Sequence, residues 1–139
     1  MTRPITEPTA LDAHTERLLT RAAELEQRWY TVPQMWTGST GTPTAPHAVV
    51  AFLEDAVKRL DQDGWEPRKR GLQQLLDGGF GNVAHVSVSV LELIICADSR
   101  INAALPLAWD LVPGRTVAEV RTLLQTGTAY ARRTAAARS

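Results

Sequence analysis

Apolar side chains recur every three or four residues along four long stretches of this sequence. That spacing gathers the apolar side chains on one face of an α-helix and leaves the charged ones on the other. It predicts four principal helices, over about residues 9–29, 48–63, 82–105 and 116–132. Because such faces are buried only against one another, we expect a mainly α, compact bundle.

The third stretch carries two patterns at once. Val86, Val88 and Val90 alternate with serines as in a β-strand, whereas a larger apolar set keeps a helical spacing from Val83 to Ala104. Strands are usually about five or six residues long, so a stripe sustained over this many turns favours a helix for residues 83–90. Since its polar face is only partial, we expect this helix to be central and mostly buried.

Capping residues mark the ends of two helices. Pro113-Gly114 predicts a turn, Thr116 is a good N-cap, and Glu119 completes a capping box three residues later. Gly64 follows the second helix at the position of a left-handed C-cap. The ends of the chain, about residues 1–8 and 134–139, are expected to be flexible.

Two connections lie between the helices. Residues 30–46 are rich in Pro, Gly, Thr and Ser and predict a loop, in which a small hairpin could form because Thr, Val and aromatic residues favour extended backbone. Residues 71–79 predict one short helix that ends at paired glycines. The 139 residues therefore predict a single helical domain of four principal helices plus one short helix, with Trp65 and Trp109 near the ends of the central helix.

Charge and cysteine content narrow the class of protein. Lys plus Arg and Asp plus Glu both number 15, so the whole chain exerts no net attraction on nucleic acid or on an anionic membrane. Cys96 is the single cysteine, which rules out an intramolecular disulfide and favours the cytoplasm. No apolar run suggests a signal peptide, a membrane anchor or a membrane span, so no membrane partner is expected.

Candidate catalytic and metal-binding groups are scattered along the sequence. His14, His47 and His85 fall in three different elements, and their spacing matches no metal-ligand motif. Cys96 stands among Ile and Ala residues and is expected to be a small buried hydrophobe. We therefore assign no catalytic residue, no metal and no cofactor, and expect a protein without enzymatic activity.

One run of residues resembles a known family. Trp109-Asp110-Leu111-Val112-Pro113-Gly114-Arg115-Thr116 is similar to the Trp-Asn-Asp-x-Pro-Gly-Arg-Thr hallmark of small actinobacterial and actinophage proteins of unknown function. The resemblance extends over about residues 46–130 and implies a mainly helical fold and an accessory role. The sequence departs from the hallmark at Asp110 and Leu111, and it lacks the family's Cys-containing motif before the buried helix.

Three functions are compatible with these observations. The first is a non-catalytic accessory or protein-interaction protein that holds a partner, or a second copy of itself, through an exposed loop containing Met35 and Trp36 or through one helix face. Trp36 could instead serve as a lid on the core. The second is a nucleic-acid-binding regulator that uses the Arg-rich last helix, namely Arg121, Arg132, Arg133 and Arg138, with Arg68-Lys69-Arg70.

The third is a small-molecule-binding protein or enzyme with its site in the loop over residues 109–115. Trp109, Asp110 and Arg115 place an indole, an acid and a base within this loop. The alternative for the same residues is structural, because an Arg115–Asp110 ion pair would stiffen the turn.

Overall fold

A computed structural model describes residues 13–30, 34–37, 41–65, 76, 82–98 and 115–138 of the chain. The described residues form an all-helical bundle of four α-helices and one short 3-10 helix, and none of them is in a strand. The fold class predicted from the sequence is confirmed. The elements are α1 (Ala13–Trp29), η2 (Gln34–Thr37), α2 (Pro46–Asp63), α4 (Asn82–Ala97) and α6 (Val117–Arg138).

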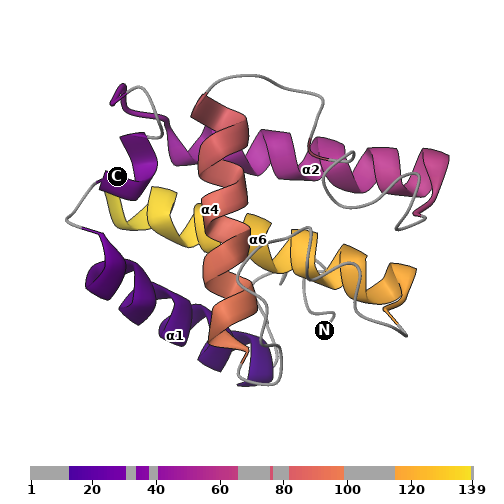
Figure 1. Cartoon of the computed structure of the whole chain (residues 1–139), viewed down its shortest axis with the longest axis horizontal. Helices are drawn as coiled ribbons and strands as arrows, with labels where there is room; N and C mark the ends of the chain where they lie inside the picture. Colours follow the sequence, from indigo (N-terminus) through magenta and orange to yellow (C-terminus); the bar gives the residue numbers. More distant parts are fainter. Residues whose placement is uncertain are drawn as a thin grey trace, which may run out of the picture.

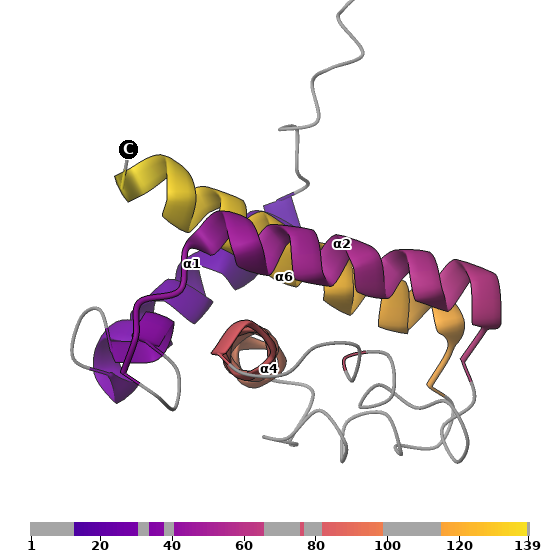
Figure 2. The same ribbon diagram turned by 90° about the horizontal axis from the view of Figure 1, so that it is seen from above.

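The bundle has α4 at its centre. Helices α2 and α6 run beside each other, and α4 crosses them (Figure 1). In the view from above, α4 is seen nearly end-on below this pair (Figure 2). Helix α1 packs against α4 and also meets α6, so α4 contacts each of the other three α-helices.

Helix α4 confirms the helix predicted for residues 83–90. Nine of its side chains are buried, including those of Ser87 and Ser89. The Ser89 hydroxyl donates to the carbonyl of His85, 3.2 Å away, within the helix. The alternation of Ser and Val therefore does not mark a two-faced strand, because both serines are buried within the helix and the backbone accepts the hydroxyl proton of Ser89.

The two predicted caps differ in outcome. At the start of α6, the Glu119 N–H donates to Thr116 Oγ1 (3.2 Å) and the Thr116 N–H donates to Glu119 Oε1 (2.8 Å), so the capping box is confirmed. At the end of α2, the Gly64 N–H donates to the Leu60 carbonyl and its φ is +77°, but its ψ is −174°. Gly64 is thus not in the left-handed helical conformation; it occupies a region open almost only to glycine.

Several helix boundaries were predicted within a few residues, but α4 ends at Ala97, before the predicted residue 105, and α6 includes residues 134–138, which were expected to be flexible. Helix α1 ends at Trp29 as expected, and the Trp29 side chain is 49% exposed there. Helix α2 begins at Pro46, two residues before the prediction, because proline at the first helical position lacks only an N–H that the helix does not use. Helix α6 continues beyond Arg132 to Arg138, helped by the burial of Ala135.

The hairpin suggested for residues 30–46 is wrong for the part of this segment that the structure describes. Gln34–Thr37 is a 3-10 helix, and the Thr44 N–H donates to the carbonyl of Trp36. The Asn82 side chain holds the same segment by donating to the carbonyls of Thr37 and Thr42. Burial of Met35 and Trp36, both below 3% exposed, outweighs the preference of aromatic residues for strands.

Some predicted features lie outside the described residues. They include the flexible segment over residues 1–8, the Arg68-Lys69-Arg70 patch, residues 99–105 of the third predicted helix, and Trp109. Of the short helix predicted at residues 71–79, only Leu76 is described, and its side chain is buried. Trp65 is described, and its partly buried side chain packs against the core, while its predicted place near an end of the central helix stays a prediction.

Candidate functional site

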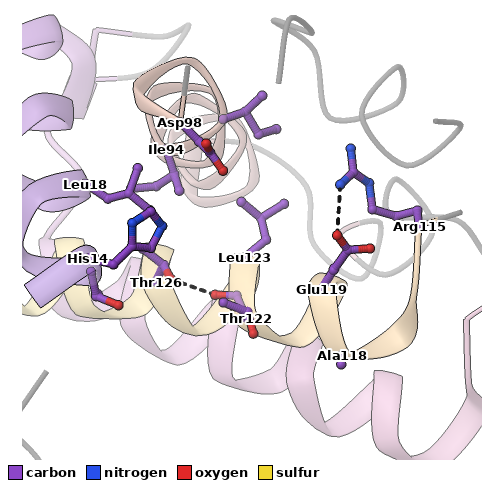
Figure 3. A pocket seen from close by; sticks show the side chains of 12 residues that line it. His14, Leu18, Ile94, Asp98, Arg115, Ala118, Glu119, Thr122, Leu123 and Thr126 are labelled. Carbon is purple, nitrogen blue, oxygen red and sulfur yellow. Dashed lines mark hydrogen bonds and ion pairs between the residues drawn. The ribbon is translucent and has the colours of Figure 1, made fainter. Parts of the chain in front are cut away.

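A cleft of about 340 Å³ lies where α1, the end of α4 and the beginning of α6 meet. Figure 3 shows its lining from close by. Its position follows from the fold, because α4 ends and α6 begins beside the first turns of α1. The lining residues are His14, Thr15, Leu18, Ile94, Ile95, Asp98, Arg115, Ala118, Glu119, Thr122, Leu123 and Thr126.

The cleft has an apolar floor and a polar rim. The floor consists of side chains that are also part of the hydrophobic core, namely Leu18, Ile94, Ile95 and Leu123. The rim carries an exposed imidazole at His14 and the partly exposed carboxylate of Asp98. Because the floor side chains are held by packing on all their other sides, the apolar surface of the cleft is formed before any ligand arrives.

Arg115 and Glu119 border one side of the cleft (Figure 3). Arg115 Nη1 lies 3.4 Å from Glu119 Oε2. The Arg115 side chain is 8% exposed and the Glu119 side chain is 48% exposed. The other oxygen of Glu119 accepts the Thr116 N–H of the capping box. The Glu119 carboxylate therefore caps the N-terminus of α6 and also orients the guanidinium of Arg115 at the cleft wall.

The structure brings one residue of the predicted loop site to this cleft. Arg115 lines the cleft, whereas Trp109 and Asp110 lie outside the described residues, as does the predicted Arg115–Asp110 pair. The contributions of His14, Leu18 and Asp98 were not predicted from the sequence. Helical spacing shows which side chains are buried, but it does not show which helix ends meet.

Trp36, the residue proposed for an exposed interaction loop, is 1% exposed. Its indole N–H donates to Glu26 Oε2 at 2.8 Å, and the hydroxyl of Tyr130 donates to the other oxygen of Glu26. The guanidinium of Arg138 lies over the Trp36 ring, 5.4 Å from its centroid. Trp36 thus joins η2 to α1 and α6, and its burial agrees with the alternative interpretation of this residue as a lid on the core.

Burial has a clear electrostatic effect on Tyr130. It raises the pKa of the Tyr130 phenol well above its ordinary value, and the hydrogen bond to Glu26 and the negative charge of Glu26 raise this pKa further. Tyr130 therefore remains protonated and continues to donate to Glu26 throughout the physiological range. No feature of the sequence singled out Glu26, which is one of several acids along α1.

Three of the four α6 arginines proposed for nucleic-acid binding form ion pairs with other helices, and the fourth, Arg138, lies over the Trp36 ring. Arg121 pairs with Asp61 and Arg132 with Glu54, both on α2. Arg133 pairs with Glu16 of α1, with 2.6 Å between Nη2 and Oε1. These side chains are 39–60% exposed, and each arginine faces a carboxylate from a neighbouring helix.

Cys96 is half-buried, whereas its apolar neighbours in the sequence predicted a small buried hydrophobe. Burial raises the pKa of its thiol, and the carboxylate of Glu92, one helical turn earlier, raises it further. Burial also raises the pKa of Glu92 itself. Over the part of the chain that the structure describes, no three His, Cys, Asp or Glu side chains are grouped so that they could hold a metal ion.

Membrane insertion and similarity to known proteins were tested separately. Among the described helices, none combines the length and the apolar character that crossing a membrane requires.

Comparison of the chain with protein-family models, with curated proteins and with solved structures finds no match. The resemblance of residues 46–130 to the actinobacterial and actinophage family therefore stays a prediction.

Proposed function

We propose that this protein is a non-catalytic accessory protein of the cytoplasm that binds a small amphipathic molecule in the cleft between α1, α4 and α6. One observation carries the proposal: the cleft of about 340 Å³ joins an apolar floor from three helices to a polar rim. Small-molecule sites typically have volumes of about 300–1,000 Å³ and combine apolar walls with a few polar groups that orient the ligand.

Glu119 has a structural role in the wall of the cleft. Both oxygens of Glu119 are already engaged, one by Thr116 and the other by Arg115. The carboxylate of Glu119 therefore serves the helix cap and Arg115 together. We assign Glu119 the role of orienting Arg115, and we assign His14 and Thr122 to contacts with the polar part of the ligand.

The proposal is tested by an NMR titration of the ¹⁵N-labelled full chain with a set of small fragments. The set contains aliphatic and aromatic compounds in amine, carboxylate and uncharged forms. We expect saturable shifts of the backbone amide signals of Leu18, Asp98 and Thr122, which line the cleft. Shifts scattered over the surface, or an absence of saturation with every fragment, would contradict the proposal.

A pair of matched variants makes the titration specific to the cleft. Ala118→Phe introduces a ring at an exposed position that lines the cleft, and Ala51→Phe introduces the same ring at an exposed position on α2. We expect Ala118→Phe to weaken binding of the best fragment at least tenfold, and Ala51→Phe to leave it unchanged. Equal affinities in the two variants would place the fragment elsewhere.

A second candidate function is contact with a partner protein or with another copy of the chain. The specific observation is Trp29, which is 49% exposed at the end of α1, since tryptophan is enriched at the centres of protein interfaces. Light scattering tests self-association: if Trp29 is the contact, the wild-type mass exceeds that of a monomer and Trp29→Gln restores the monomer mass. A monomeric wild-type protein would contradict self-association.

The ion pairs of α6 count against the nucleic-acid alternative. Arg121, Arg132 and Arg133 already face carboxylates, and those acids would repel a phosphate backbone. The same light-scattering experiment with a short DNA duplex at low salt provides the test. We expect no increase in mass, and a salt-sensitive increase would favour the nucleic-acid alternative.

A further inference from the structure

We draw no further inference here: the strongest candidate outside the cleft, the half-buried pair of Glu92 and Cys96 one turn apart on α4, rests on a lone cysteine and on two raised pKa values, and no second observation among the described residues indicates a ligand for it.

Discussion

Helix α6 meets its neighbours in two different ways. Toward α2 and α4 its buried contact is apolar and tight, since a Cβ on Gly127 would lie 2.8 Å from Leu91 Cδ2 and 3.2 Å from Leu53 Cδ1. The ion pairs of Arg121 and Arg132 with α2 lie at the exposed edge of this contact. Toward α1 its contact is polar, through the pairs of Tyr130 with Glu26 and of Arg133 with Glu16. The cleft also opens on the α1 side.

This difference gives the two sides of α6 different expected roles. The apolar side contributes to the free energy of folding, and the α1 side contains the cleft proposed for binding. Close apolar packing contributes most of the favourable free energy of folding and leaves no room for a ligand. The hydrogen bonds and ion pairs between α6 and α1 add little net stabilisation, and the cleft lies beside them. We therefore expect substitutions on the α2 and α4 side to change stability most, and substitutions around the cleft to change binding.

The largest expected effect is that of Gly127→Val, which would break the tight contact. The valine side chain cannot fit against Leu91 and Leu53 without moving them, and overpacking of this kind costs about 3 kcal/mol of unfolding free energy. Gly127→Ala should cost less, because alanine recovers about 1 kcal/mol of helix propensity. Urea unfolding followed by circular dichroism measures both.

Gln125→Val is the matched control for Gly127→Val, since Gln125 is exposed on the same helix. It should cost less than about 1 kcal/mol, which is the range of helix propensities. Equal stabilities of Gly127→Val and Gln125→Val would show that α6 does not approach α4 as closely as the structure indicates.

The polar contact on the α1 side is tested by Glu26→Leu. The substitution leaves the N–H of Trp36 and the hydroxyl of Tyr130 without their acceptor, and an unsatisfied buried donor costs about 1–3 kcal/mol. We expect a loss of about 2 kcal/mol in urea unfolding, with part of it recovered in Glu26→Gln. Glu24→Leu, at an exposed position of α1, should be nearly neutral; a loss as large as that of Glu26→Leu would rule out the hydrogen-bond explanation.

Tyr130, on the α1 side, makes the free energy of unfolding depend on pH in the alkaline range. Its pKa is raised in the folded protein by burial first and by Glu26 second, so the unfolded chain loses this proton at lower pH than the folded one. Stability from this group is fully present below about pH 10 and declines above it, by about 1 kcal/mol at pH 11. Tyr130→Phe should remove this part of the alkaline decline. The same decline in both proteins would contradict the assignment.

Ser87 is expected to destabilise the tightly packed region. Its side chain is fully buried, and its hydroxyl has no hydrogen-bond partner among the described residues. Ser87→Ala removes an unsatisfied polar group, so we expect thermal unfolding to show a gain of about 1 kcal/mol. Ser89→Ala is the control, because the Ser89 hydroxyl already has an acceptor and should give a smaller gain.

The smallest expected effect is that of the exposed pair between Arg133 and Glu16. A double-mutant cycle with Arg133→Gln and Glu16→Gln should give a coupling free energy below about 1 kcal/mol, decreasing with added salt. A coupling above about 2 kcal/mol would show that the α1 side stabilises the bundle as strongly as the apolar side.

Local patterns predicted most of the helices. The capping box of Thr116 and Glu119 involves residues three apart, so the sequence contains both partners of each hydrogen bond. The helix over residues 83–90 followed from the length of its apolar stripe. The segment around Trp36 was mispredicted because its conformation depends on Glu26, Tyr130 and Asn82, which are distant in the sequence.

The candidate site was predicted only in part. Arg115 was identified because it shares a loop with Trp109 and Asp110, and its neighbour Glu119 was identified as part of a capping box. His14 and Asp98 carried no signal, because their relation to Arg115 arises only when α1, α4 and α6 pack together. A cleft between helix ends depends on where helices terminate relative to one another, which periodicity does not encode.

By itself, the sequence determined that the protein is helical, where most helices begin and end, and which side chains are apolar enough to form the core. The helices depend on interactions between residues close in the sequence. The apolar character of a side chain depends on its own free energy of transfer from water, largely independently of its partners. Only the tertiary structure decided that Trp36 is buried, that the C-terminal arginines face carboxylates, and that a cleft lies beside Arg115. Those outcomes depend on the crossing of helices far apart in the chain, because burial and charge pairing are properties of the packed bundle.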